Sequence, residues 1–171
     1  MRQNTCAIIS CNPIGFPWGY DEEDEGCAAL KLLLLNRITL LRAEGVTDFA
    51  VVMDSGVGLY ASEMINSLRE NDPDLNLTCV VPYEEQSTKW TPELRDRYFN
   101  EQAKCSEVEF ASMEKTAASK VIAMLNAVDR AEHVIAVTVK EDSLIPVALH
   151  YAERLNREIL VVDAERMRYY E

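Results

Sequence analysis

Positive charge is scarce in this chain. Its 171 residues include 17 lysines and arginines against 29 aspartates and glutamates, a formal net charge of −12 at pH 7. Nucleic acids and anionic membranes carry charge of the same sign, so non-specific binding to either is disfavoured. The densest basic cluster lies at Arg166–Arg168. We therefore expect no nucleic-acid partner and no membrane partner.

Patterns typical of metal sites and disulfide frameworks are also missing. The chain has only two histidines, and its five cysteines form no C-x-x-C pair. Neither histidine stands at ligand spacing from a cysteine, which argues against a zinc site. The odd cysteine count is typical of free thiols in a reducing compartment.

No targeting or membrane-spanning segment is predicted. Met1–Thr5 is polar, and the apolar run that follows is too short for a signal peptide. The leucine-rich run Ala28–Leu41 is interrupted by polar and charged residues and is too short to cross a bilayer. We expect a cytoplasmic protein.

Apolar residues, in contrast, are plentiful. They make up 48% of the chain, enough for a sizeable core, and no linker or repeat divides the sequence. We predict a single domain over residues 1–171. Short apolar runs alternate with helical periodicity, which predicts an α/β fold: a Rossmann-like three-layer α/β/α sandwich with a mainly parallel sheet. The predicted strands are 5–10, 49–53, 77–81, 108–112, 134–139 and 158–162, and the predicted helices are 21–44, 57–71, 92–104, 114–129 and 144–155.

A strand–turn–helix unit follows the first predicted helix. The strand 49–53 runs into a turn that holds Gly56 and Gly58, and a helix begins directly afterwards. Such a helix N-terminus can bind phosphate through its free backbone N–H groups. This turn also holds Asp54 and Ser55, and no lysine or arginine is near in the sequence. Because a carboxylate repels phosphate, we expect any ligand to carry less charge than a dinucleotide.

The loops after the first three predicted strands are expected to converge. In parallel sheets, ligands lie at the carboxyl ends of strands, where the strand order reverses. The converging loops are 11–20, 54–58 and 82–90. Trp18 and its aromatic neighbours in the first loop either wall a pocket or pin the loop to the body, and pinning is favoured. The acidic run 21–25 is interpreted as a solvated helix start.

Two longer motifs carry a resemblance. The run F-P-W-G-Y-D-E-E-D-E at Phe16–Glu25 resembles a family segment F-G-Y-D-E-E-D. Pro82–Trp90, followed by R-D-R-Y at Arg95–Tyr98, resembles P-x-E-x-Q-x-x-x-W and R-E-R-Y. On these motifs the chain resembles the YpsA-like proteins of the SLOG superfamily, which also holds DprA and the LOG phosphoribohydrolases. The resemblance covers roughly Thr5–Asp163 and implies a Rossmann-like fold that binds nucleotide-like ligands.

The chain departs from this family where phosphate would bind. Family members commonly read G-H-R-P after the first strand, whereas Ser10–Pro13 reads S-C-N-P. In the family pattern S-G-x-x-x-G-x-D, Val51 and Val52 replace the first pair, Gly56 keeps the last glycine and Gly58 replaces the aspartate. The arginine-rich run of the fourth helix and the glycine-rich turn after the fifth strand are also altered. The scaffold is thus predicted to persist with a remodelled pocket.

The favoured hypothesis is a non-catalytic ligand-binding or sensing protein for a nucleotide-derived or other small ligand. Glu84 and Gln86 could hydrogen-bond a ribose or a base edge, and Trp90 could stack on a base. The competing interpretation is structural: the two polar residues cap neighbouring loops and the tryptophan belongs to the core.

Two alternatives stay open. An N-glycosidase or phosphoribohydrolase would use Glu63, although the LOG motif P-G-G-x-G-T-x-x-E and its arginine are lacking. A scaffold protein without a ligand could form a homodimer through the helix 28–41. No catalytic residue, metal ligand or cofactor is assigned. The candidate ligand-binding residues are Ser10, Asn12, Pro13, Trp18, Asp54, Ser55, Gly56, Gly58, Glu63, Glu84, Gln86 and Trp90.

Overall fold

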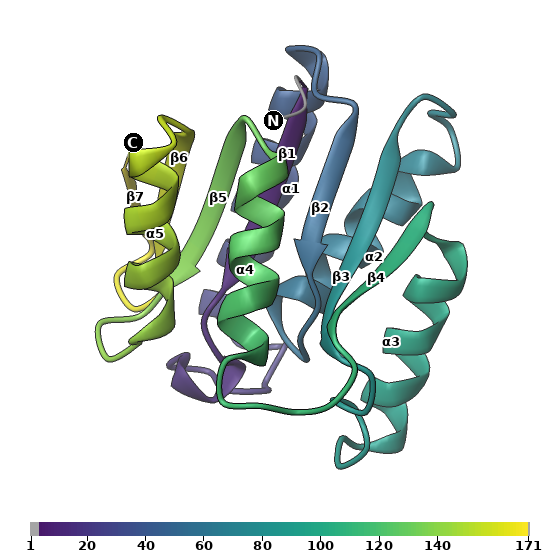
Figure 1. Cartoon of the computed structure of the whole chain (residues 1–171), viewed down its shortest axis with the longest axis vertical. Coiled ribbons are helices and arrows are strands. Elements are labelled where there is room, and N and C mark those ends of the chain that lie inside the picture. The colour runs from purple at the N-terminus through teal and green to yellow at the C-terminus, as the bar shows by residue number, and fades with distance from the viewer. Residues whose placement is uncertain (1–3, 171) are drawn as a thin grey trace.

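A seven-stranded sheet forms the centre of the protein. The computed structural model describes residues 4–170 (Figure 1). The strand order is β4-β3-β2-β1-β5-β6-β7; all neighbours pair in parallel except β6 and β7, which are antiparallel. The strands are β1 (Thr5–Ser10), β2 (Asp48–Val52), β3 (Asn76–Tyr83), β4 (Glu107–Ser112), β5 (His133–Thr138), β6 (Glu158–Asp163) and β7 (Arg168–Tyr170).

Helices cover both faces of this sheet. In Figure 1, α4 and α5 lie in front of the strands, and α1 and α2 lie behind them. This arrangement confirms the predicted Rossmann-like three-layer sandwich. The helices are α1 (Glu25–Ala43), α2 (Val57–Arg69), α3 (Pro92–Lys104), α4 (Ser119–Arg130) and α5 (Leu144–Arg154), with a short 3₁₀ turn η1 at Pro13–Gly15.

The strand order reverses at β1, which lies between β2 and β5 as the predicted central strand. All six residues of β1 are buried, and the four middle residues of β5 are buried as well. Continuous apolar runs of this kind are typical of strands that are covered on both faces. The loop at the carboxyl end of β1 therefore borders the reversal point between β1 and β5, where α/β sheets place their ligands, and the loop after β2 lies beside it on the other side.

Capping residues define the helix boundaries. The Thr91 side chain accepts a hydrogen bond from the backbone of Leu94 at 3.4 Å, which confirms the predicted start of α3. Gly45 follows α1 with φ +110°, the left-handed conformation that glycine adopts readily. Asp24 caps α1 by accepting from Gly26 N at 2.7 Å, so the helix begins after most of the acidic run.

Several predicted boundaries were wrong: α1 begins at Glu25 instead of residue 21, and β3 continues to Tyr83 instead of ending at residue 81. The fourth helix begins at Ser119 instead of residue 114, because the backbone N–H of Thr116 donates to Ser119 Oγ at 2.8 Å and closes a turn there. A strand beyond the last predicted one, β7, pairs with β6 through Asp163 and Arg168.

The remaining expectations concern thiols and membranes. All five cysteines are free; Cys105 is partly exposed and the other four are buried. Between residues 4 and 170, no helix is long and apolar enough to cross a membrane. The same described residues hold no cluster of three metal-ligating side chains.

Candidate functional site

The three predicted loops do converge at the carboxyl edge of the sheet. They enclose a cavity of about 190 Å³, to which the N-terminus of α4 also contributes. Trp90 borders this cavity and also two larger hollows of about 780 and 460 Å³, and it is the residue that all three linings share. The cavity is lined by Asn12, Pro13, Tyr20, Met53, Asp54, Ser55, Pro82, Tyr83, Gln86, Trp90 and Lys120.

Asp54 occupies the N-terminus of α2. Its side chain is buried, with only 6% of the residue exposed. Oδ1 accepts hydrogen bonds from the backbone of Gly56 at 2.8 Å and of Gly58 at 2.9 Å. These are the donors that a bound phosphate would use at a helix N-terminus. A carboxylate of the chain itself therefore fills the anion position of this loop.

The second carboxylate oxygen, Oδ2, has no hydrogen-bond donor among the described residues, although it is buried. Burial raises the pKa of the Asp54 carboxyl. The charge of Lys120 and the two backbone hydrogen bonds oppose this rise only in part. Asp54 thus lines the cavity with one of its oxygens satisfied and the other buried without a donor among the described residues.

Both glycines of this turn are required by packing. A Cβ on Gly56 would lie 2.5 Å from Pro13 Cγ, and one on Gly58 would lie 2.3 Å from the backbone oxygen of Val52. The latter contact is with a rigid, buried strand. The glycine pattern therefore arises from the close approach of α2 to β2, which needs no phosphate to explain it.

Lys120 corrects the expectation that no cation lies near this turn. It stands in the first turn of α4 and lines the same cavity as Asp54. The two residues are distant in the sequence because α2, β3, α3 and β4 lie between Asp54 and the start of α4. The cavity is consequently less negative than its loop sequence indicates.

Polar side chains tie the loops together around the cavity. Tyr20 Oη and Ser55 Oγ share a hydrogen bond of 2.9 Å, in which either can donate. Gln86 Nε2 donates to the backbone oxygen of Met53 at 3.2 Å and to Tyr98 Oη at 2.9 Å. Gln86 therefore has a structural role through its amide nitrogen, and its amide oxygen is the atom suited to a ligand.

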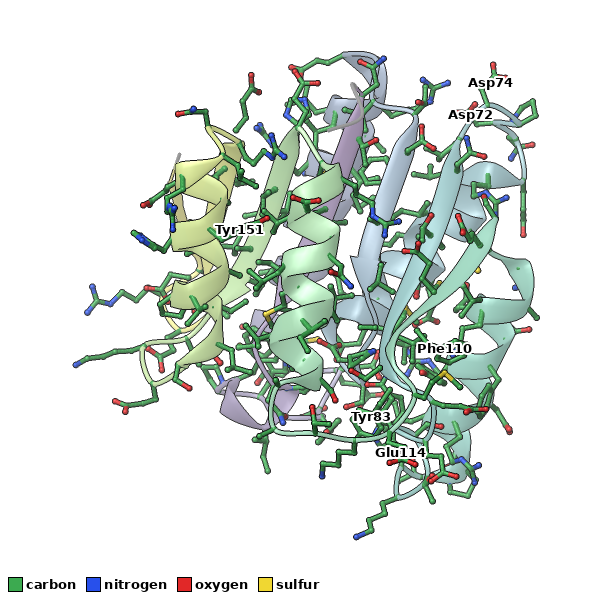
Figure 2. All side chains as sticks on the ribbon, in the orientation of Figure 1. Asp72, Asp74, Tyr83, Phe110, Glu114 and Tyr151 are labelled. Carbon is green, nitrogen blue, oxygen red and sulfur yellow. The ribbon has the colours of Figure 1, made fainter. Side chains whose placement is uncertain are left out.

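Trp90 is held in place by Tyr98 of α3. Its ring meets that of Tyr98 edge-on, with the centroids 4.9 Å apart. The residue is only partly buried, so the core interpretation of Trp90 applies to one side of the ring. Glu84 is exposed and lines the largest hollow; Figure 2 shows two other lining residues, Tyr83 and Glu114, at the same end of the molecule.

Five predicted site residues line none of the three hollows: Gly56 and Gly58, which bind Asp54 Oδ1 through their backbone, and three residues that lie elsewhere. Ser10 is buried, and its hydroxyl donates to the backbone oxygen of Cys11 at 3.1 Å. Trp18 is 8% exposed and stacks on Phe16 with centroids 5.0 Å apart, so it pins the loop and lines none of the three hollows. Glu63 also lies outside their linings, on α2.

An ion cluster links the first loop to α2 and α3. Arg97 donates to both carboxylate oxygens of Glu22, at 2.6 and 2.9 Å, and to Glu63 at 2.6 Å. Lys31 Nζ also reaches Glu22 at 2.7 Å. Hydrogen bonds from Arg97 and Lys31 lower the pKa of Glu22 to about 2, against the opposing effect of burial. The acidic run is therefore more than a solvated helix start.

Sequence reasoning missed Tyr20, Arg97 and Lys120 as members of this region. Arg97 stands in the R-D-R-Y motif and Tyr20 in the F-P-W-G-Y motif, so the motifs themselves held the signal for these two residues. Lys120 had no motif to identify it.

Comparison with known proteins assigns the chain to a family. A family model for YpsA, described as the YspA SLOG family, matches residues 15–142. A UPF0398 protein of Bacillus licheniformis is 30% identical over 79 residues, which cover 46% of this chain and 43% of that protein. The UPF0398 protein YpsA of Bacillus subtilis is 27% identical over 79 residues, 46% of this chain and 44% of its own length. The matched part thus spans less than half of each of these relatives. With three quarters of its length inside the family match, the chain belongs to the YpsA family of SLOG proteins.

Proposed function

We propose that this chain is a non-catalytic ligand-binding or sensing protein whose pocket takes a nucleotide-derived ligand without a phosphate at the α2 loop. One observation carries the proposal: Oδ1 of Asp54 accepts the hydrogen bonds of Gly56 N and Gly58 N. A phosphate that entered this loop would lose both donors and would face a charge of its own sign.

The electrostatic cost is considerable. Two unit charges about 4 Å apart near a protein surface repel each other by roughly 4 kcal/mol. Lys120 offsets part of this repulsion, but it forms no ion pair with Asp54 within the described residues. A neutral nucleoside avoids the repulsion and can still use the aromatic wall of the site.

Trp90 is the surface that favours an aromatic ligand. The residue borders all three hollows, and stacking of a base on a tryptophan ring contributes about 1–3 kcal/mol. Glu84 and the amide oxygen of Gln86 lie in the adjoining wall and can accept hydrogen bonds from a base edge. These groups recognise a base through its ring and its donors, without a need for phosphate.

Isothermal titration calorimetry with matched ligands tests the proposal. The four ribonucleosides, their 5′-monophosphates and ADP-ribose are titrated into the purified chain. We expect at least one nucleoside to bind at least tenfold more tightly than its monophosphate. A monophosphate or ADP-ribose that binds more tightly than every nucleoside would overturn the proposal, and so would the absence of any binding.

Trp90→Ala locates the binding surface. We expect it to weaken nucleoside binding about tenfold or more, because the stacking surface is lost. Phe110→Ala is the matched control: Phe110 is 45% exposed on β4 and lines none of the three hollows. Equal weakening in both variants would argue against a site at Trp90.

A further inference from the structure

The unsatisfied oxygen of Asp54 indicates what part of a ligand reaches the cavity. Asp54 is 94% buried, since its exposed fraction is 6%, and no described group donates to Oδ2. A buried ionised oxygen without a donor is costly, so such atoms are normally paired in the functional state. Oδ1 is held by Gly56 and Gly58, which fixes the direction of Oδ2 relative to α2.

The charges around Oδ2 restrict the donor. Burial disfavours the ionised form of Asp54, and the two backbone hydrogen bonds, the α2 dipole and Lys120 offset this effect in part, so a further donor to Oδ2 would stabilise the carboxylate. An ammonium group or a metal cation would satisfy the oxygen, but Lys120 lines the same cavity and repels positive charge. A phosphate brings no donor at neutral pH. The donor that fits is therefore an uncharged hydroxyl or amide group.

The neighbouring groups favour hydroxyls that occur in pairs. Tyr20 and Ser55 line the cavity beside Asp54 and share one hydrogen bond in which either can donate. This pair can therefore present a donor or an acceptor to a second ligand hydroxyl. The cavity of about 190 Å³ corresponds to about six water molecules, which suits a sugar ring better than a single solvent molecule.

We propose that Asp54 Oδ2 accepts a hydrogen bond from the ribose diol of an unphosphorylated ribonucleoside, with the Tyr20–Ser55 pair contacting the second hydroxyl. This inference rests on the proposed function and specifies the part of the ligand bound at the α2 loop. Carboxylates are suited to such a contact, since in α/β dinucleotide sites an acidic residue binds the ribose 2′-hydroxyl. In this arrangement the carboxylate that occupies the anion position of the loop binds a hydroxyl group of the ligand.

Deoxynucleosides test the inference on the unaltered protein. For the nucleoside that binds best, the ribo form is compared by calorimetry with its 2′-deoxy and 3′-deoxy forms and with the free base. We expect removal of the hydroxyl that Asp54 contacts to weaken binding about tenfold to a hundredfold, as for hydrogen bonds to charged groups. The free base is expected to bind more weakly than either deoxy form.

Asp54→Asn assigns the effect to Oδ2. An asparagine oxygen can still accept from Gly56 and Gly58, while an NH₂ group replaces the ligand-facing oxygen. We expect this variant to lose most of the discrimination between the ribo and deoxy forms. Thermal unfolding checks that the variant is folded; if it is not, the deoxynucleoside series on the wild type decides alone.

The outcomes separate the two proposals. Equal binding of the ribo and both deoxy forms to the wild type would overturn the diol inference and leave nucleoside binding intact. Unchanged discrimination in folded Asp54→Asn would overturn the role of Oδ2. If no nucleoside binds the wild type, the proposed function fails and the diol inference fails with it.

Discussion

Gly58→Ala is expected to destabilise this protein, although the same change usually stabilises a helix. Gly58 is the second residue of α2 and is buried. An added Cβ would lie 2.3 Å from Val52 O, 3.0 Å from Met53 Cα and 3.1 Å from Met53 C. All three atoms belong to the backbone at the end of β2, so no side chain can rotate to make room.

The magnitude follows from two opposing effects. Alanine favours a helix over glycine by about 1 kcal/mol, partly by restricting the unfolded chain. Overpacking of a well-packed core costs about 1–3 kcal/mol, and the 2.3 Å contact places this site at the upper end. We expect a net loss of about 1–2 kcal/mol. For a chain of this size, that corresponds to a fall in Tm of about 2–8 °C.

Thermal and urea unfolding, followed by circular dichroism, measure this loss. Ser67→Ala is the control, since Ser67 is an exposed residue of the same helix and the change should alter stability by less than about 0.5 kcal/mol. Gly58→Ala as stable as the wild type, or more stable, would refute the argument that packing of α2 on β2 requires this glycine.

Three further predictions concern ionised groups. Because bonds from Arg97 and Lys31 lower the pKa of Glu22 from 4.5 to about 2, its stabilising effect is complete above pH 4.5 and is lost as the pH falls toward 2. Glu22→Gln should lower the free energy of unfolding by about 1 kcal/mol at pH 7, allowing for solvent screening. In urea titrations the difference from the wild type should disappear as the pH falls from 4.5 toward 2. A difference that does not change with pH would contradict this. Burial raises the pKa of Asp54 above 3.8, so the wild type should lose stability relative to Asp54→Asn as the pH rises from that value. Urea unfolding of both proteins measures the difference. A wild type that gains stability relative to the variant over this range would contradict the prediction. Lys120→Gln removes an opposing charge and should raise the pKa of Asp54 further, as measured by carboxyl ¹³C NMR; an unchanged titration would mean that Lys120 does not act on Asp54.

The inner part of the sheet could be predicted from the sequence because β1, β2 and β5 are apolar almost throughout. The run at 5–10 became β1 with both boundaries correct, and convergence of the first three loops followed from parallel topology alone. Helix starts were less predictable. Residues 114–118 share the composition of α4, and only the turn between Thr116 and Ser119 excludes them from it.

The position of the loop cavity was predictable, but the charged groups around it were not. The glycines of the α2 loop suggested a former phosphate site, yet their contacts with Pro13 and Val52 explain them through packing. Lys120 shares a cavity with Asp54, and Arg97 bonds Glu22, across long stretches of sequence. A local sequence pattern cannot predict such contacts. Charge partners are a property of the tertiary structure, so loop sequences alone overstate how negative a site is.

The Asp54 side chain also competes with free phosphate for the backbone N–H groups of Gly56 and Gly58. A group that belongs to the chain meets its own binding position at an effective concentration set by its short connection, which reaches the millimolar range or above even for flexible links. Here the connection is a two-residue turn, since Asp54 bonds the backbone of Gly56. Free phosphate in solution would have to exceed that local concentration to displace the carboxylate. We therefore expect the loop to respond little to changes in the phosphate pool, and we expect replacement of the Asp54 side chain to remove this protection.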